Sequence, residues 1–175
     1  MQKALFLDRD GVINIDHGYV YQIEKFEFTE GIFALLRLFI DKGYVLFIVT
    51  NQSGIGRDYY REEDFQVLTS WMLEELKQEN IHIVSVEHCN HAPEVNCHCR
   101  KPEIGMIESI LLSHNISLEN SWLIGDKQSD IDLAKNSKIQ NSIAIGTRKI
   151  DNATLAFPSI LECKDYMEVN KDRII

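Results

Sequence analysis

Short runs of apolar residues alternate along the chain with stretches whose apolar residues recur every three or four positions. The runs are rich in Val, Ile and Leu, lack polar alternation, and occupy residues 4–7, 45–49, 81–86, 122–124 and 143–145. Such runs predict strands buried on both faces, as in a parallel sheet covered by helices. The alternation therefore predicts a doubly wound, Rossmann-like α/β fold with helices on both faces of the sheet.

The helical pattern is clearest between the first two predicted strands. Apolar residues recur there at i, i+3, i+4, i+7 and i+8 from Ile32, and Gly43 follows where a C-terminal glycine cap belongs. A second helix is predicted around residues 65–76, a third around 107–111 and a shorter one at 130–136. We expect these elements to form one domain over residues 1–175, the length of an ordinary domain.

Composition and charge exclude several kinds of protein. The chain is 45% hydrophobic and 26% charged, as in soluble globular proteins. No apolar run approaches the roughly 20 residues that span a bilayer, and the short run after Met1 predicts a strand rather than a signal peptide. The net charge of −9 argues against a nucleic-acid partner. We expect a cytoplasmic monomer with no membrane partner.

Two carboxylates, Asp8 and Asp10, directly follow the first predicted strand. At positions i and i+2 past a strand, both side chains can turn toward a common point. One carboxylate can then attack as a nucleophile while the other donates a proton to a leaving oxygen. Taken alone, the pair also fits a solvated acidic loop or a helix N-cap.

Other polar groups follow the other predicted strands, and parallel strands bring such residues to one edge of the sheet. Thr50 and the backbone N–H groups after it can donate to phosphoryl oxygens. Arg100 and Lys101 supply positive charge, and Asp126 supplies a carboxylate of the kind that Mg²⁺ prefers.

Three of the four cysteines lie within eleven residues and are interleaved with a histidine. In a cytosolic chain, such clustering indicates a metal site before disulfides. The C-x-H-x₅-C-x-C pattern predicts a closed, structural Zn²⁺ site. Its ligands would be Cys89, His91, Cys97 and Cys99. Free thiols, or His88 or His98 as a competing ligand, are the alternatives, and Cys163 is expected to behave as a buried apolar residue.

These segments, in this order and spacing over about residues 5–130, resemble the four motifs of the haloacid dehalogenase (HAD) superfamily of phosphotransferases. The resemblance implies that Asp8 is the nucleophile and Asp10 the general acid and then base. It implies that Thr50 and Lys101 stabilise the transferring phosphoryl group. It also implies that Mg²⁺ is bound by Asp8, the backbone carbonyl of Asp10, and Asp126.

The superfamily has more than one chemistry, and Asp10 distinguishes between two of them. Its dehalogenases lack a carboxylate at this position because a halide leaves without a proton. An alkoxide needs one, so Asp10 favours phosphate esters. Many members also carry a cap domain, but the usual insertion points are filled by the predicted loops and helices, so no cap domain is expected.

Within the superfamily, the loop after Asp10, the run NQSGIGRDYY, the cysteine loop and GDKQSD resemble one subgroup, the bacterial heptose-bisphosphate phosphatases. The resemblance implies removal of the C7 phosphate of D-glycero-D-manno-heptose 1,7-bisphosphate. The product would supply nucleotide-activated heptose for lipopolysaccharide cores or other surface glycans. The implied substrate-binding residues are Asp16, His17, Gly18, Tyr19, Asn51, Gln52, Ser53, Arg100 and Lys127. A bisphosphate needs cations for its second phosphate, and Arg100 and Arg57 are available.

Alternatives remain open at this point. Histidinol-phosphate phosphatases have a similar zinc loop, although their cationic substrate suits this arginine supply less well. Gly18 and Tyr19 also fit a simple turn with a packing aromatic, and Lys127 fits a solvated lysine. A zinc-binding interaction domain without activity is the alternative of another class. The intact motif carboxylates, threonine and lysine argue against it.

Overall fold

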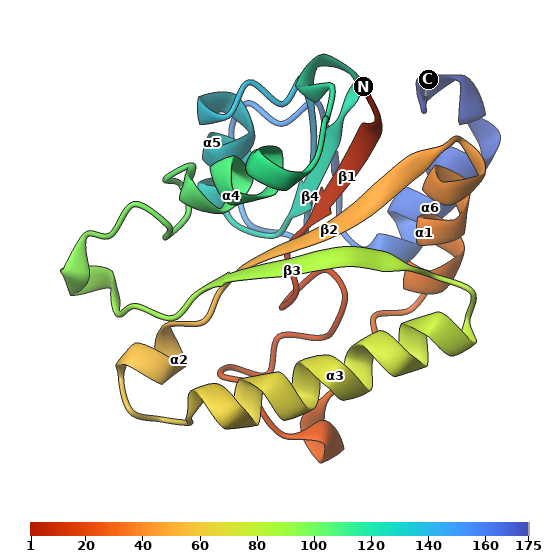
Figure 1. Cartoon of the computed structure of the whole chain (residues 1–175). Helices are drawn as coiled ribbons and strands as arrows, with labels where there is room; N and C mark the ends of the chain where they lie inside the picture. Colours follow the sequence, from red (N-terminus) through yellow and green to blue (C-terminus); the bar gives the residue numbers. More distant parts are fainter. Residues whose placement is uncertain (175) are drawn as a thin grey trace.

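The computed structural model describes residues 1–174, which form a parallel sheet flanked by helices (Figure 1). Its six strands are β1 (Lys3–Leu7), β2 (Tyr44–Asn51), β3 (Ile83–Cys89), β4 (Trp122–Gly125), β5 (Asn141–Ile145) and β6 (Leu155–Phe157). Their order is β3-β2-β1-β4-β5-β6, and every pairing is parallel. The predicted doubly wound α/β fold is confirmed.

Helices cover both faces of this sheet. The helices are α1 (Ile32–Asp41), α2 (Ser53–Gly56), α3 (Glu62–Gln78), α4 (Gly105–Ser113), α5 (Gln128–Asn136) and α6 (Ile160–Val169), with 3-10 turns at Ile23–Lys25, Pro93–Val95, Leu118–Asn120 and Lys171–Arg173. The apolar residues of α1, α3 and α6 pack on one face with Leu5 and Leu7 of β1, whereas those of α4 and α5 pack on the other with Ala4 and Phe6. Successive β1 residues thus face opposite layers.

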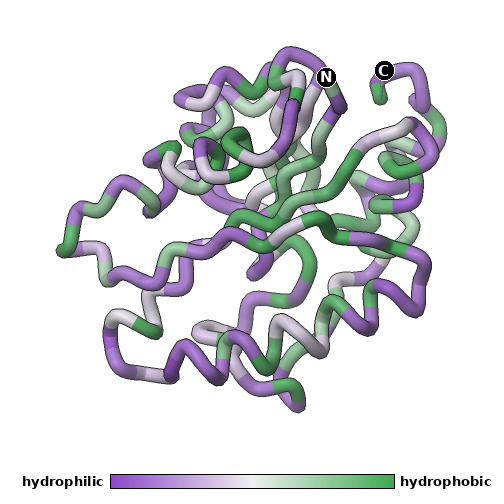
Figure 2. The backbone as a smooth tube through the Cα atoms, viewed as in Figure 1, coloured by the Kyte–Doolittle hydropathy of each residue, from purple (hydrophilic) through white to green (hydrophobic). Residues whose placement is uncertain are grey.

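Hydropathy follows this layered arrangement. In Figure 2 the strands at the centre are predominantly hydrophobic, while the outer turns and loops carry most of the hydrophilic residues. Over residues 1–174, a search for a helix with the length and apolar character of a membrane span finds none. No separate cap covers the sheet edge in the described part of the chain, as expected.

Some element boundaries differ from the predicted ones. The third strand was predicted at residues 81–86 but runs Ile83–Cys89. Ile81 is buried, yet its N–H donates to Leu76 O at 2.9 Å, so it closes the turn after α3 instead of joining the sheet. Strand β6 and helix α6 were not predicted. β6 is a three-residue edge strand with an exposed central alanine, which is too short to give a periodic signal.

The register of the sheet brings the polar strand ends together. β1 lies between β2 and β4, with Leu7 opposite both Ile48 and Ile124. The Asp8 N–H continues this ladder by donating to Ile124 O at 3.0 Å. Asp8 therefore leaves the sheet between the ends of β2 and β4, where the ligand sites of such sheets are found.

Candidate active site

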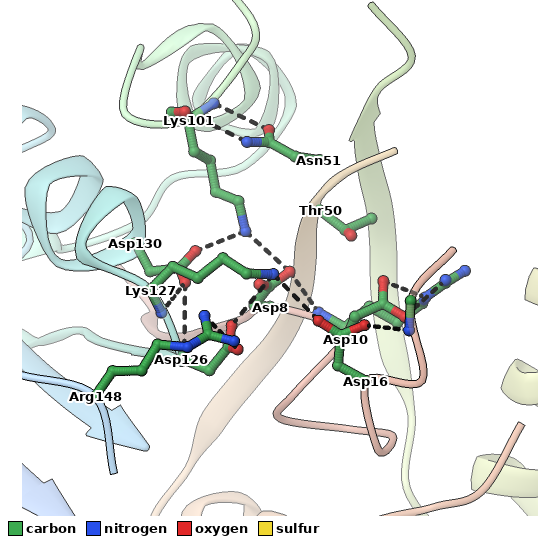
Figure 3. A network of polar contacts seen from close by, with 12 residues as sticks. Asp8, Asp10, Asp16, Thr50, Asn51, Lys101, Asp126, Lys127, Asp130 and Arg148 are labelled. Carbon is green, nitrogen blue, oxygen red and sulfur yellow. Dashed lines mark hydrogen bonds and ion pairs between the residues drawn. The ribbon is translucent and has the colours of Figure 1, made fainter. Parts of the chain in front are cut away.

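Asp8 lies beside Lys101 in the interior of the site (Figure 3). Lys101 Nζ lies 2.9 Å from Asp8 Oδ1, 2.7 Å from Asp130 Oδ1 and 2.9 Å from the carbonyl of Val49. The backbone N–H of Arg9 also donates to Asp8 Oδ1, at 2.7 Å. Lys101 thus donates a hydrogen bond to Val49 O and forms ion pairs with two carboxylates at once.

Burial governs the ionisation of these groups. Loss of solvent raises the pKa of Asp8 to about 7, although the charge of Lys101 opposes the shift. Desolvation also works against the charged form of Lys101, but Asp130 and Asp8 outweigh it and raise the pKa of the ammonium group. Lys101 is therefore a fixed positive charge, whereas Asp8 needs further positive charge to be fully ionised at neutral pH.

Three buried carboxylates could hold a cation. Ligand oxygens of Asp8, Asp126 and Asp130 all lie within 4.8 Å of one another. Asp126 Oδ1 is buried without a hydrogen-bond partner among the described residues. Gly11 makes this approach possible, since a Cβ there would lie 2.5 Å from the Asp126 carboxyl carbon. Carboxylate oxygens gathered this closely are the ligands that a hard divalent cation such as Mg²⁺ prefers.

The side chain of Asp10 is directed elsewhere, so any metal contact would use its backbone carbonyl. Its carboxylate accepts from Arg9 Nε at 3.1 Å and Nη2 at 2.9 Å. It also accepts from Asn14 Nδ2 at 3.1 Å and Gln52 Nε2 at 3.0 Å. Burial disfavours the charged form, but Arg9 and the hydrogen bonds outweigh it and lower the pKa of Asp10.

Asp130 is a site residue that sequence reasoning missed. It is 1% exposed, and its Oδ2 accepts from the backbone N–H groups of Asp126 at 3.2 Å and Lys127 at 3.0 Å. It thereby caps the start of α5 while its other oxygen faces Lys101. The signal was present in GDKQSD, where the second aspartate lies in the first turn of a helix, four residues after the first.

A cavity of about 380 Å³ opens beside these groups. Its walls include Asp10, Asp16, Gly18, Tyr19, Asn51, Gln52, Ser53, Tyr60, Arg100, Lys101, Lys127 and Ser129. Most of the predicted substrate residues thus meet in one cavity. His17 does not line it, and its Nε2 lies 3.5 Å from Glu27 Oε2. A larger cavity of about 440 Å³ borders Asp126 and Arg148 but does not include Asp8, Asp10 or Lys101.

The cations differ in how the structure uses them. Arg100 lines the cavity, and its Nη1 is buried without a hydrogen-bond partner within residues 1–174. Lys127 Nζ lies 3.5 Å from Asp16 and 3.7 Å from Asp126, bridging the loop after β1 to the end of β4. Arg57 does not line this cavity. Its Nη2 lies 3.8 Å from Glu94 of the cysteine loop.

Two predicted substrate residues are already engaged by protein groups. Asn51 Oδ1 accepts from the backbone N–H of Lys101 at 3.0 Å, and its Nδ2 donates to the Lys101 carbonyl at 3.3 Å. Gln52 is 3% exposed and donates to Thr50 Oγ1 at 2.8 Å as well as to Asp10. Tyr60 donates to Gln52 Oε1 at 2.5 Å. Both amides therefore order the site as well as bordering its cavity.

The predicted zinc ligands form one cluster. The ligand atoms of Cys89, His91, Cys97 and Cys99 all lie within 4.8 Å of one another, with sulfur–sulfur distances of 3.1–3.4 Å between free cysteines. Burial disfavours thiolates here, yet hydrogen bonds from Cys99 and Cys89 lower the pKa of Cys97 to about 6. Three sulfurs and one imidazole in a group this tight could hold a metal ion.

The competing histidines lie outside this cluster. His88 Nε2 is 2.7 Å from Glu62, and His98 Nε2 is 2.6 Å from Glu108. Cys163 is fully buried in the apolar layer of α1 and α6, as expected for a cysteine that acts as an apolar residue.

Known proteins are similar to this chain in sequence and in fold. Residues 98–159 match a family model described as "HAD-hyrolase-like". A D-glycero-beta-D-manno-heptose-1,7-bisphosphate 7-phosphatase of Helicobacter pylori (strain ATCC 700392 / 26695) is 46% identical over 168 residues, which cover 95% of each chain. A D-glycero-alpha-D-manno-heptose-1,7-bisphosphate 7-phosphatase of Campylobacter jejuni is 48% identical over 147 residues and 84% of each chain.

A solved structure has the same architecture. The D,D-heptose 1,7-bisphosphate phosphatase of B. bronchiseptica, complexed with magnesium and phosphate, superposes with a TM-score of 0.82 at 23% identity. The match covers 96% of this chain and 99% of that one.

Proposed function

The chain belongs to the HAD-like hydrolases and, within them, to the heptose-1,7-bisphosphate 7-phosphatases, and on this premise we propose that it removes the C7 phosphate of D-glycero-D-manno-heptose 1,7-bisphosphate through a phospho-aspartate on Asp8. The product would enter the synthesis of nucleotide-activated heptose for lipopolysaccharide cores or other surface glycans. The observation that carries the proposed chemistry is the convergence of Asp8, Asp126 and Asp130 around Lys101, which lines the same cavity as Asp10.

In the first step, Asp8 attacks the phosphorus of the C7 phosphate. Its Oδ1 is held by Lys101 and the Arg9 N–H, which leaves Oδ2 to form the new bond. The bond between phosphorus and the C7 oxygen breaks. Asp10 must enter this step protonated, although Arg9 and the amide donors favour its charged form, and it gives that proton to the C7 oxygen, which leaves as an alcohol. Thr50 and Lys101 stabilise the charge on the transferring group.

In the second step, water attacks the phospho-aspartate. The carboxylate of Asp10 takes a proton from the water, the bond between phosphorus and Asp8 breaks, and inorganic phosphate leaves. Asp10 thereby regains the proton that it gave up in the first step. Mg²⁺ bound by Asp8, the Asp10 carbonyl and Asp126 would supply positive charge that offsets repulsion between the anionic nucleophile and the phosphate.

The second phosphate of the substrate needs its own cations. Arg100 and Lys127 line the cavity, and the unpartnered Nη1 of Arg100 supports an anion there. Asp16, Gly18, Tyr19 and Ser53 would contact the sugar, while the exposed His17 would act from the rim.

We assign Zn²⁺ to Cys89, His91, Cys97 and Cys99 as a structural ion. Cys99 stands two residues before Lys101, and Asn51 binds the Lys101 backbone from the side of β2. A loop ordered by zinc would therefore hold the lysine opposite Asp8. Tetrahedral sites with four protein ligands leave no open position, so zinc would contribute through geometry alone.

The rest of the proposal concerns the protein as a whole. We place it in the cytoplasm as a monomeric enzyme made of a single domain over residues 1–175. The net charge of −9 disfavours nucleic acid as a partner.

The test compares substrates side by side. With Mg²⁺ present, kcat/KM should be higher for heptose 1,7-bisphosphate than for histidinol phosphate, and Asp8→Asn should release no phosphate from either. A preference for histidinol phosphate would overturn the substrate assignment alone. Equal phosphate release by Asp8→Asn and the unaltered protein would overturn the proposed nucleophile.

A further inference from the structure

Arg9 is buried at the centre of the site, between the two catalytic aspartates in sequence. Its side chain is 1% exposed. Its Nε and Nη2 donate to the two carboxylate oxygens of Asp10, and Nη2 also donates to Val20 O at 2.6 Å. We infer that Arg9 is a positioning residue that fixes the orientation of the Asp10 carboxylate for proton transfer. This inference rests on the proposed role of Asp10.

A two-point contact does what a single contact cannot. One hydrogen bond or a point charge lets a carboxylate rotate about its own axis, whereas the planar guanidinium bonded through two nitrogens sets the plane of the group. Arg9 Nε reaches Asp10 Oδ2 and Arg9 Nη2 reaches Oδ1. The plane of the Asp10 carboxylate, and with it the direction in which its two oxygens face the cavity, is therefore set by Arg9.

A second set of donors completes the same arrangement. Asn14 Nδ2 donates to Asp10 Oδ1 at 3.1 Å, and Gln52 Nε2 donates to Oδ2 at 3.0 Å. Gln52 is in turn held by Tyr60, whose ring stacks on Tyr21 with centroids 5.0 Å apart. Each carboxylate oxygen thus has two donors, one from Arg9 and one from an amide, and Asp10 still borders the cavity.

Stability alone is a poor reason for this arginine. A buried ion pair is often no better than apolar side chains of the same volume, because two charges lose their hydration. Arg9 also leaves Nη1 buried without a hydrogen-bond partner in the described part of the chain, and its guanidinium carbon lies 5.9 Å from the Phe65 ring. What the arginine achieves here is the fixed geometry of Asp10.

The inference predicts a dependence on the leaving group. An alkoxide leaves only with a proton, whereas p-nitrophenolate leaves without one. A misdirected Asp10 should therefore slow the cleavage of an alkyl phosphate and spare p-nitrophenyl phosphate. The ratio kcat/KM is the quantity to compare, because it ends at the departure of the alcohol and excludes the later hydrolysis of the phospho-aspartate.

The experiment measures kcat/KM of Arg9→Lys on heptose 1,7-bisphosphate, on glycerol phosphate as a generic alkyl ester, and on p-nitrophenyl phosphate. Lysine keeps the charge but removes the two-point contact. We expect a loss of about 10- to 100-fold on the alkyl esters and of about threefold or less on the aryl ester. The first loss is smaller than the roughly 100- to 10,000-fold that a general acid contributes, because Asp10 itself is still present. Arg37→Lys, on the exposed Arg37–Glu79 pair, is the matched control and should change neither.

Two further variants keep the outcome decisive. Asp10→Asn removes the proposed acid altogether and so measures the largest difference between alkyl and aryl esters that its loss can cause. If circular dichroism shows that Arg9→Lys does not fold, Gln52→Met tests the other donor to the Asp10 carboxylate. Equal losses on both ester classes in Arg9→Lys or Gln52→Met would mean a merely structural role and overturn the inference. If Asp10→Asn itself shows no preference for the aryl ester, the proposed acid role of Asp10 is wrong, which is a separate failure.

Discussion

The substitution Asp130→Asn isolates the ion pair that holds the proposed phosphate-binding lysine. Asparagine has the same shape, and its oxygen can still accept from the backbone N–H groups of Asp126 and Lys127, so the cap of α5 is kept. Its amide nitrogen would then replace the oxygen that lies 2.7 Å from Lys101 Nζ. A donor would face a donor, and Lys101 would lose one of its two carboxylates.

The magnitude follows from burial. Removing one partner of a buried ion pair costs roughly 3–5 kcal/mol. Lys101 keeps Asp8 and the Val49 carbonyl, and the loss of one of three crowded carboxylates relieves repulsion. We therefore expect Asp130→Asn to lower the free energy of unfolding by about 2–3 kcal/mol. With one negative charge fewer in the cluster, the Mg²⁺ concentration for half-maximal activity should rise about 10- to 100-fold.

Urea unfolding and a Mg²⁺ titration of phosphatase activity measure these two effects. Asp132→Asn is the matched control, since Asp132 lies on the same helix and accepts from Gln128 at 2.9 Å instead of binding Lys101. It should change the free energy of unfolding by about 0.5 kcal/mol or less. If Asp130→Asn also fell within that limit and kept its Mg²⁺ midpoint, Asp130 would hold neither Lys101 nor the metal.

Three further perturbations address the loop, the sheet edge and the cavity rim. Removing zinc with a chelator in excess Mg²⁺ should lower kcat about 10- to 100-fold, because Lys101 would be displaced, and added zinc should restore kcat. An unchanged kcat in protein shown by mass spectrometry to be zinc-free would contradict this. Gly125→Ala would place a Cβ 2.1 Å from that of Asp130 and should cost about 1–3 kcal/mol in urea unfolding, whereas an unaltered midpoint would show that the backbone yields. Tyr59→Ala removes the edge-to-face contact with Tyr19 at 4.8 Å and should raise KM about two- to tenfold with kcat unchanged; a fall in kcat alone would refute it.

Much of the site could be predicted because its residues follow strands that are easy to recognise. β1, β2 and β4 are nearly continuous apolar runs, so their ends, and hence the positions of Asp8, Thr50 and Asp126, were predicted within two residues. The predicted position of edge strand β3 was too early in the sequence, because half-buried polar residues near its end, including Glu87, interrupt the apolar pattern.

Partners far apart in sequence could not be read from the motifs. Asp130 was missed because its function depends on Lys101, which a separate loop brings to within 2.7 Å. The buried state of Arg9 was missed for a similar reason. An arginine after a strand is ordinarily solvated, and only the tertiary structure brings the Phe65 ring and the Val20 carbonyl to it.

The sequence by itself determined the alternation of strands and helices, the order of the motif residues and the ligand types of both candidate metal sites. These depend on the periodicity of short segments and on the chemistry of individual side chains, and both can be seen in the sequence without knowledge of distant contacts. The tertiary structure decided that Lys101 pairs with both Asp8 and Asp130. It also decided that Gln52 donates to Asp10 and Thr50, and that Arg57 pairs with Glu94 and does not line the cavity. Such choices depend on distances between separate segments, and burial makes the energy of each charge depend on those distances.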